Sequence, residues 1–396
     1  MLQQQVQKKL PSMNIQVPVN EPLLIGNEEK YVLECIRSGW ISSEGPFVKK
    51  FEDAFAQQVN RHFGISVANG SVALDVTIQA LQLGQGDEVI LPTFTIISCA
   101  AAIVRAGATP VLVDSNPITW NMCAEDIAKK ITPRTKAIMV VHIYGLPVDI
   151  DPILELAKKH NLFVVEDAAE MIGQEYKGKP CGSFGDISTV SFYANKHVTT
   201  GEGGMVLTNN LHLAERARAA RNLFFQPARR YVHEELGNNF RLTNLQAAVG
   251  LAQLERLGES VKKKRTMGRY YQNALKGFTS IQRPLDHTAY AENIYWVFGI
   301  VLKEFTTTAI AAQTFLAKLD IGTRAFFWPM HEQPVFKKMG LFIGESYPNA
   351  EMLARQGFYI PSGLAITQEQ QDYVITWLGS FLHGCDLPEF PDQVRG

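Results

Sequence analysis

Short apolar runs alternate with longer amphipathic segments between about residues 60 and 225. The runs are rich in β-branched residues and predict seven strands, at residues 64–68, 88–91, 109–113, 137–141, 162–166, 187–192 and 204–208. Between them, apolar residues at helical spacing predict helices, among them residues 71–83, 97–106, 150–160 and 211–222. This alternation indicates an α/β domain built on a sheet of βα units.

Residues 193–203 are all that separate the last two predicted strands, which leaves no room for a crossover helix. We therefore expect these strands to pair antiparallel, so that the seven-stranded sheet is mixed. One long amphipathic helix is expected at residues 244–275, followed by a compact β-α-β pattern at residues 295–302, 307–319 and 322–328. The expected division is a large domain over residues 14–270 and a smaller C-terminal α/β domain over residues 271–385.

The composition of the chain limits the kinds of molecule that it is expected to bind. The chain has 396 residues, 46% of them hydrophobic, which is enough for a full core. Its formal net charge of -1 provides no positive field for nucleic acid or anionic membranes. The five cysteines are scattered without a CxxC pair, and no apolar run approaches the ~20 residues of a membrane span. We expect a cytoplasmic protein with small-molecule partners, no metal, and no binding to nucleic acid or membrane.

The segment SFYANKHVTTGEGG, residues 191–204, is unusual for a solvated turn. A predicted strand ends there in a polar turn that is rich in glycine and contains a single lysine, Lys196. A lysine, with an ordinary pKa of ~10.4, becomes a nucleophile near neutral pH only in a desolvated or cationic site. A strand end beside close-packed glycines can provide such a site. Exposed lysines in turns are common, so this motif alone leaves both interpretations open.

The segment VVEDAAE, residues 164–170, delivers carboxylates at the end of another predicted strand. In α/β sheets the carboxyl ends of the strands face the ligand crevice. A carboxylate such as Asp167 can hold a pyridine nitrogen in its protonated form, which turns the ring into an electron sink. The alternative is a cap on the following helix.

A third segment, ANGSVA at residues 68–73, passes from a strand through Gly70 directly into a helix. Free N–H groups and the helix dipole at such a start bind phosphate, and Ser71 adds a hydroxyl group. Ser191, five residues before Lys196, could place a second hydroxyl on the same phosphate. Any βα loop can show this pattern, so by itself the motif is weak.

These three segments, together with WISSEG, GDEVILPTFT, ITPRTKAIMVVHIYG and GNNFRLTNLQAAVGLAQLE, resemble the DegT-like sugar aminotransferases of nucleotide-sugar biosynthesis over residues 14–380. The resemblance implies a pyridoxal 5'-phosphate (PLP) enzyme of the aspartate aminotransferase-like fold, fold type I. Within the family the pattern is most similar to the GDP-perosamine synthase subfamily. This implies transfer of an amino group from L-glutamate to C4 of GDP-4-keto-6-deoxymannose, a step of lipopolysaccharide O-antigen biosynthesis.

The resemblance also implies roles for individual residues. By position, Lys196 binds PLP covalently and moves the proton, Asp167 pairs with the pyridine nitrogen, and Glu170 lies beside the ring. The other implied PLP contacts are Gly70, Ser71, Val72, Ile96, Ser191 and Asn239. Asn239 matches an asparagine that reaches the phosphate from the neighbouring subunit, which implies a homodimer with shared active sites. Relatives with histidine at the lysine position are dehydratases, so the intact Lys196 favours transamination.

Ile96 departs from the family pattern, because relatives usually have an aromatic residue there that packs over the cofactor ring. An aliphatic side chain still covers the ring by van der Waals contact, but the stacking interaction is lost. This keeps open a dTDP- or UDP-linked keto sugar, or a smaller keto compound, as the substrate. A PLP-binding regulator without turnover is the alternative of another class, which the intact Lys196 and Asp167 disfavour.

Three residues are candidate substrate contacts. Ser42 lies in the loop after a predicted helix, and Arg230, in QPARRYVHEELG, could bind a diphosphate through its guanidinium group. His331 lies near an aromatic cluster of the predicted small domain. The alternatives are a plain turn, a solvated basic loop and core packing. His142, at a predicted strand end, is left out of the catalytic set because an internal hydrogen bond explains it equally well.

Overall fold

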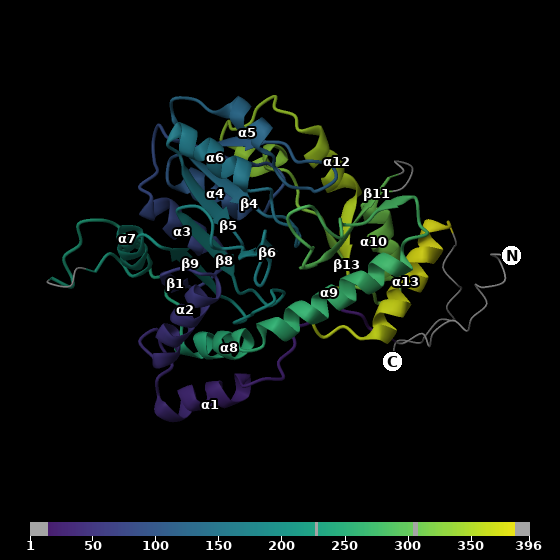
Figure 1. Cartoon of the computed structure of the whole chain (residues 1–396), viewed down its shortest axis with the longest axis horizontal. Helices are drawn as coiled ribbons and strands as arrows, with labels where there is room; N and C mark the ends of the chain where they lie inside the picture. Colours follow the sequence, from purple (N-terminus) through teal and green to yellow (C-terminus); the bar gives the residue numbers. More distant parts are fainter. Residues whose placement is uncertain (1–14, 226–228, 304–307, 385–396) are drawn as a thin grey trace.

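The computed structural model describes residues 15–225, 229–303 and 308–384. Its central feature is a seven-stranded sheet in the order β1-β9-β8-β5-β4-β2-β3 (Figure 1). The strands are β1 (Phe63–Val67), β2 (Glu88–Pro92), β3 (Thr109–Val113), β4 (Thr135–Val141), β5 (Phe163–Asp167), β8 (Ile187–Ser191) and β9 (Gly204–Thr208). Only β9 runs antiparallel to its neighbours in this sheet. The predicted mixed sheet and the antiparallel pairing of its last two strands are confirmed.

Alternating side chains of the strands enter two different apolar cores. On β2, for example, Val89 and Leu91 pack in one core and Ile90 in the other. The first core is covered by α3 (Gly70–Ala80), α4 (Ile97–Arg105) and α7 (Leu211–Arg221). The second is covered by α2 (Pro46–Gln58), α5 (Ala124–Lys130), α6 (Asp151–His160) and α8 (Asn244–Leu254). The sheet is therefore buried on both faces, as its near-continuous apolar strands require.

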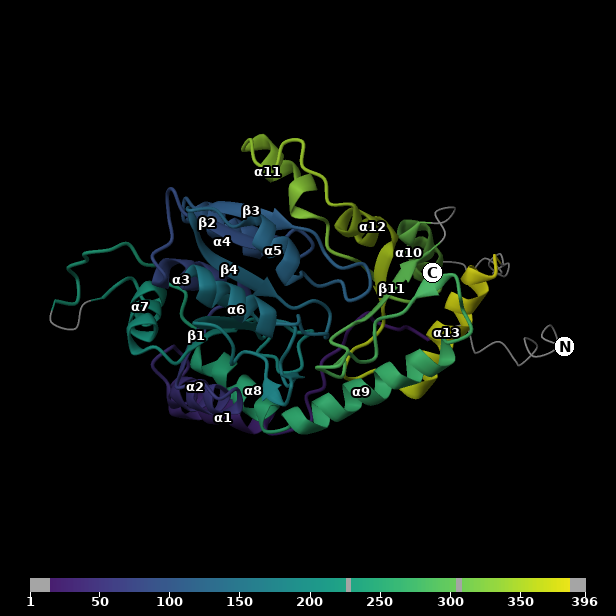
Figure 2. The same cartoon turned by 45° about the horizontal axis from the view of Figure 1, so that its top comes forward.

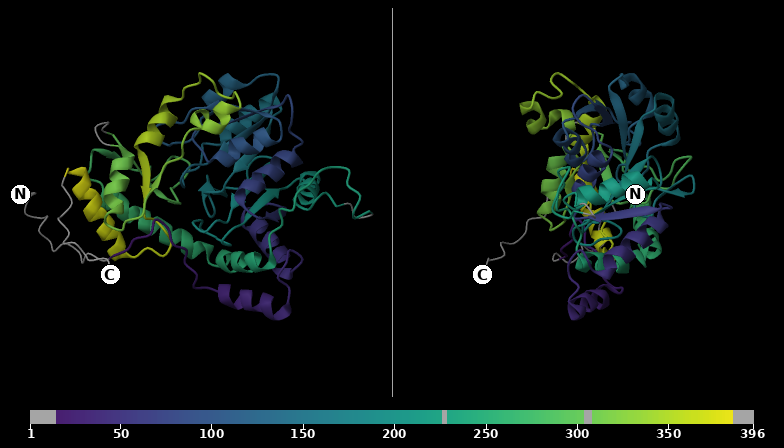
Figure 3. Two further views of the ribbon diagram at one scale, coloured as in Figure 1. Left: turned by 180° about the vertical axis from the view of Figure 1, so that it is seen from behind. Right: turned by 90° about the vertical axis from the view of Figure 1, so that its left-hand side faces the viewer.

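A second, four-stranded sheet lies in the C-terminal part of the chain (Figures 2 and 3). Its strands are β10 (Ile281–Gln282), β11 (Phe298–Leu302), β13 (Gly357–Ile360) and β12 (Arg324–Ala325), in that order and all antiparallel. The expected β-α-β pattern is therefore incomplete, because β13 enters between β11 and β12 from about thirty residues downstream. Local periodicity cannot indicate such a long-range pairing. The helix expected in the middle of the β-α-β pattern begins at residue 307, which lies outside the described residues.

The remaining elements surround the two sheets. They are α1 (Glu28–Ser38), the hairpin of β6 (Glu175–Tyr176) and β7 (Lys179–Pro180), α9 (Leu257–Ala274), α10 (Ala309–Ala317), a 3₁₀ turn (Met330–Glu332), α11 (Pro334–Lys338), α12 (Pro348–Gln356) and α13 (Gln368–Leu382). Among the described residues, no helix is both long enough and apolar enough to cross a lipid bilayer.

The prediction of a single long helix at residues 244–275 is wrong, because the structure has two helices there, α8 and α9. At the break, the Glu255 carboxylate accepts hydrogen bonds from Asn27 Nδ2 at 2.7 Å and Tyr31 Oη at 2.6 Å. These contacts tie α8 to α1, whereas α9 turns toward the second sheet (Figure 1). The expected domain boundary after residue 270 falls inside α9, so the division into two domains stays a prediction. Its outer limits, residues 14 and 385, lie outside the described residues.

Candidate active site

A cavity of about 830 Å³ lies against the carboxyl ends of β4, β5 and β8. This is the edge of an α/β sheet at which strand ends and helix starts converge and ligands bind. Eight of the nine residues expected to contact PLP line the cavity: Gly70, Ser71, Val72, Ile96, Asp167, Glu170, Ser191 and Lys196. The fold thus brings together three motifs that are spread over residues 68–204 of the sequence.

Lys196 lies half-buried in the turn that follows β8. Its side-chain nitrogen is 3.6 Å from the centroid of the Trp296 ring. Within the described chain, this nitrogen has no hydrogen bond or ion pair. Desolvation lowers the pKa of Lys196 to about 8, although the carboxylates of Glu170 and Asp167 oppose this change. The uncharged, nucleophilic form of the amine is therefore more populated near neutral pH than in an ordinary lysine.

Asp167 is buried at the end of β5 and is fixed by three donors. Its Oδ1 accepts from Ala169 N at 3.1 Å and from Thr189 Oγ1 at 3.4 Å, and its Oδ2 accepts from Cys99 Sγ at 3.3 Å. Burial raises the pKa of Asp167, although the hydrogen bonds from Ala169 and Cys99 and the nearby Lys196 lower it in part. A buried carboxylate that is fixed in this way in the cavity wall is suited to pair with a cationic N–H group of a ligand.

Glu170 lies three residues beyond Asp167, also in the cavity wall. Tyr144 N donates to its Oε2 at 2.6 Å. Burial raises the pKa of Glu170 to about 8, while the nearby Lys196 and the Tyr144 amide lower it. Glu170 and Lys196 therefore both change charge near neutral pH and each favours the charged form of the other.

The start of α3 forms an anion-binding corner of the cavity. The N–H of Val72 donates to the capping side chain of Asn69 at 3.0 Å. The amides of Gly70 and Ser71 have no acceptor within the described chain, so they remain as donors for an anion. A Cβ atom on Gly70 would lie 2.8 Å from the Cβ atom of Ser191. Glycine is therefore needed for the helix start to approach Ser191 so closely.

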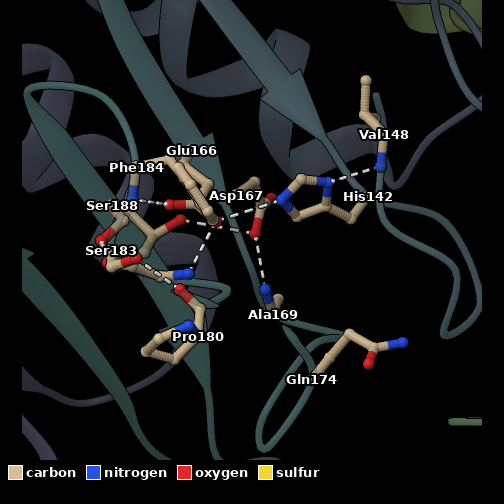
Figure 4. Close-up of polar contacts among 12 residues, drawn as sticks. His142, Val148, Glu166, Asp167, Ala169, Gln174, Pro180, Ser183, Phe184 and Ser188 are labelled. Atoms are coloured by element: carbon tan, nitrogen blue, oxygen red, sulfur yellow. Dashed lines mark hydrogen bonds and ion pairs between the residues drawn. The ribbon is translucent and has the colours of Figure 1, made fainter. Parts of the chain in front are cut away.

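A buried group of hydrogen-bonded residues lies beside the cavity wall (Figure 4). The Glu166 carboxylate accepts from Gly182 N at 2.6 Å and from Phe184 N at 2.8 Å. His142 accepts from Val148 N at 3.0 Å through Nδ1, so its Nε2 holds the proton and donates to Glu166 at 3.1 Å. Both ring nitrogens of His142 are thus engaged inside the protein, although the residue borders the cavity.

Four predicted site residues do not line the cavity of their own chain: Ser42, Arg230, Asn239 and His331. The first three are exposed, and the Arg230 guanidinium lies 5.3 Å from the centroid of the Phe225 ring. His331 is buried, with Nδ1 at 2.9 Å from Thr93 Oγ1 and Nε2 at 3.0 Å from Glu351 Oε1. These hydrogen bonds agree with core packing, the alternative to substrate contact for His331. Its role in substrate binding stays a prediction.

Three aromatic residues from the C-terminal part of the chain complete the cavity wall, namely Trp296, Phe327 and Tyr359. Phe327 lies in the aromatic segment near His331, where core packing is the alternative to substrate contact. Tyr359 lies on β13, the strand that sequence analysis missed. Trp296 precedes β11 within an apolar run, where nothing distinguishes a cavity wall from a core residue. All three reach the cavity because the C-terminal part of the chain shares an apolar core with the first sheet, in which Trp296 is buried and against which Phe327 and Tyr359 pack.

Comparison with known proteins agrees with this architecture. Residues 23–379 match the model of the DegT/DnrJ/EryC1/StrS aminotransferase family. The GDP-perosamine synthases of Escherichia coli O157:H7 and Caulobacter vibrioides are each 42% identical to the chain, over 92% of its length and 98% of theirs. The crystal structure of the aminotransferase TlmJ from Streptoalloteichus hindustanus superposes with a TM-score of 0.87 at 29% identity, covering 93% of this chain and 99% of TlmJ. The predicted aspartate aminotransferase-like fold is thereby confirmed. The chain is a PLP-dependent aminotransferase and belongs to the DegT/DnrJ/EryC1/StrS family.

Proposed function

We propose that this aminotransferase transfers the amino group of L-glutamate to C4 of GDP-4-keto-6-deoxymannose and so forms GDP-perosamine. The observation that carries the proposal is the similarity, over nearly the whole chain, to two proteins named GDP-perosamine synthase. We further propose that the enzyme is cytoplasmic and supplies perosamine for lipopolysaccharide O-antigen.

The residues of the cavity fit PLP. The free amides of Gly70 and Ser71, with the Ser191 hydroxyl, suit its phosphate, and the buried Asp167 suits its ring nitrogen. The Lys196 amine, desolvated and without a hydrogen-bond partner in the described chain, suits its aldehyde carbon. When bound, PLP supplies an electron sink that allows a proton to leave the carbon attached to the transferred nitrogen.

The protein's own groups then have separate tasks. The uncharged Lys196 amine accepts the proton from Cα of glutamate and later delivers a proton to C4 of the sugar. Asp167 would hold the proton on the ring nitrogen of bound PLP. The amides at the start of α3 would bind its phosphate, and Ile96 would contact the ring through van der Waals interactions.

We also propose a homodimer in which each subunit completes the active site of the other. Ser42, Arg230 and Asn239 are exposed on their own chain, away from its cavity, where a neighbour could use them. Apolar side chains left exposed gather on and around α1, which stands out from the body of the molecule (Figure 1): Leu24, Ile25, Leu33, Ile36, Trp40 and Ile41. A second subunit would remove this apolar surface from water.

The substrate proposal is tested by single turnover of the pyridoxamine form of the enzyme. GDP-, dTDP- and UDP-linked keto sugars are offered separately, and the return of the visible PLP absorbance and the product mass are followed. We expect fast conversion of GDP-4-keto-6-deoxymannose. Conversion of only a dTDP- or UDP-linked sugar would show that the proposed substrate is wrong. Ile96 in the cavity wall, in place of the usual aromatic residue, would help to explain that result.

A further inference from the structure

Trp296 contacts the side-chain nitrogen of Lys196, although it has no part in the proton transfers described above. The side-chain nitrogen of Lys196 lies over the face of the indole ring, 3.6 Å from its centroid. The indole N–H donates to the carbonyl oxygen of Asn195 at 3.0 Å. Because Asn195 directly precedes Lys196, the ring is tied to the same turn whose lysine rests on its face.

The backbone of Trp296 is fixed as well. Its carbonyl oxygen accepts from the side-chain nitrogen of Lys264 at 2.7 Å, and Lys264 also donates to the carbonyl oxygen of Ser362. Lys264 is buried on α9 and forms no ion pair within the described chain. On the other side, a Cβ atom on Gly145 would lie 2.7 Å from Trp296 N, so glycine is required for this approach. Trp296 is therefore held from α9, from the loop after β4 and from the turn that contains Lys196.

An aromatic face attracts a cation, and tryptophan does so best among the aromatic residues. In the reaction proposed above, the Lys196 amine is free of PLP throughout both proton transfers, when its four-carbon side chain could adopt many conformations. We propose that Trp296 is a positioning residue whose ring face holds the Lys196 amine whenever that amine is not bonded to PLP. This inference rests on the proposed function, because it assumes that Lys196 is the lysine that binds PLP.

The titratable groups that line the same cavity as Lys196 are Asp75, Arg105, His142, Asp167, Glu170, Tyr193, Glu202 and Tyr359, and the buried His197 follows Lys196 in the chain. Desolvation lowers the pKa of Lys196 most, whereas Glu170 and Asp167 raise it. The ring face acts in the same direction as these carboxylates, because it stabilises the ammonium form. Replacement of Trp296 changes none of these groups, so a change in the pKa of Lys196 reports the loss of the ring.

The test uses the full-length chain freed of cofactor. The rate of acylation of Lys196 by acetic anhydride is measured against pH by peptide mass spectrometry, which yields the pKa of the amine without any turnover. Trp296→Phe keeps an aromatic face, whereas Trp296→Leu and Trp296→Met keep only apolar bulk. We expect Trp296→Phe to stay close to the wild type, and both aliphatic variants to lower the pKa of Lys196 by about half a unit to one unit.

A ring that merely shielded the amine from water would give the same pKa for the phenylalanine and aliphatic variants, and that result would overturn the inference. Trp328→Leu is the matched control, because this exposed tryptophan lies near Arg355 and away from Lys196. Circular dichroism and thermal unfolding establish that each variant is folded.

Failure of the inference is distinguishable from failure of the proposed function. Reduction of the wild-type holoenzyme with borohydride, followed by peptide mapping, identifies the lysine that binds PLP. PLP on another lysine would overturn both proposals. PLP on Lys196 together with equal pKa values in all Trp296 variants would overturn only the role of Trp296.

Discussion

Burial acts in opposite directions on the two ionisable groups at the centre of the cavity. It lowers the pKa of the Lys196 amine to about 8 and raises the pKa of the Asp167 carboxyl. In both cases the cause is the same, because a dry environment disfavours the charged form of either group. The lysine becomes reactive near neutral pH, and the carboxylate gains by pairing with a cationic ligand.

For Lys196→Ala we expect no steady transamination, because one amine both binds PLP and moves the proton. The fold should persist, since this amine has no hydrogen bond within the described chain. Turnover assays with borohydride labelling check the first point, and circular dichroism checks the second. Lys318→Ala, at an exposed position after α10, serves as the control and should keep full activity. Steady turnover by Lys196→Ala would remove this lysine from the mechanism.

For Asp167→Asn we expect PLP to bind but the proton-transfer step to slow by ~10²-fold or more, because the ring nitrogen loses its anionic partner. Stopped-flow absorbance after mixing with L-glutamate measures this step directly. The amide side chain has almost the same shape, so thermal stability should change little. A near-normal rate would contradict the role assigned to Asp167.

At the scale of elements, the junction of α3 with β8 decides where an anion can bind. The glycine-to-helix motif of residues 68–73 and the strand ending at Ser191 were both recognisable in the sequence. Their contact was not, because it depends on β8 lying two strands from β1 in the sheet. The break between α8 and α9 was missed for a related reason. Helical periodicity continues through Glu255, and only its contacts with α1 reveal the break.

Gly70→Ala tests this junction. The new Cβ atom would lie 2.8 Å from the Cβ atom of Ser191, closer than real contacts allow, so the start of α3 must move away from β8. We expect weaker PLP binding, by ~10-fold, and a loss of ~1 to 3 kcal/mol in the free energy of unfolding. Absorbance titration and denaturant unfolding measure the two effects.

Gly258→Ala is the matched control for this substitution. Gly258 lies on α9, and a Cβ atom there would meet no atom within 4 Å. The substitution should leave PLP binding unchanged and stabilise the helix by up to ~1 kcal/mol. Equal PLP affinities for the two alanine variants would show that the α3 junction does not bind the phosphate.

At the scale of the whole molecule, Lys264 of α9 is buried against the C-terminal part of the chain. This lysine extends from α9 to the carbonyl oxygens of Trp296 and Ser362, and desolvation lowers its pKa to about 7. The unfolded chain keeps the proton up to pH ~10.4, whereas the folded protein releases it near pH 7. Because the unfolded state binds more protons in this window, Lys264 makes the free energy of unfolding increase as pH rises from about 7 to ~10.4.

Lys264→Met removes this dependence. We expect Lys264→Met to be most stable, relative to the wild type, below pH 7. This advantage in the free energy of unfolding should decrease by ~3 to 5 kcal/mol as the pH is raised to ~10. Urea unfolding at several pH values provides the comparison. Lys262→Met, at an exposed position on the same helix, should leave the pH dependence of the wild type unchanged. A parallel course for Lys264→Met and wild type would mean that Lys264 keeps its ordinary pKa.

The homodimer with shared sites is tested by mixing two inactive variants. Lys196→Ala lacks the catalytic amine, and Asn239→Asp should bind PLP weakly because it brings a negative charge to the phosphate of the neighbouring site. Each heterodimer has one intact site, so random mixing should restore up to about a quarter of the wild-type activity. Lys196→Ala mixed with Asp167→Asn is the control, because both residues belong to the same site and the heterodimer has no intact one.

The sequence by itself determined the seven strands of the large sheet, the mixed character of that sheet, and the lysine, carboxylate and glycine-to-helix motifs. These are local properties, since side-chain periodicity, backbone freedom and short polar motifs depend on neighbours in the chain. Only the tertiary structure decided which motifs meet, that β13 joins the second sheet, and that Trp296, Phe327 and Tyr359 close the cavity. It also decided the ionisation of Lys196, Glu170 and Lys264, because desolvation depends on groups that approach from distant segments.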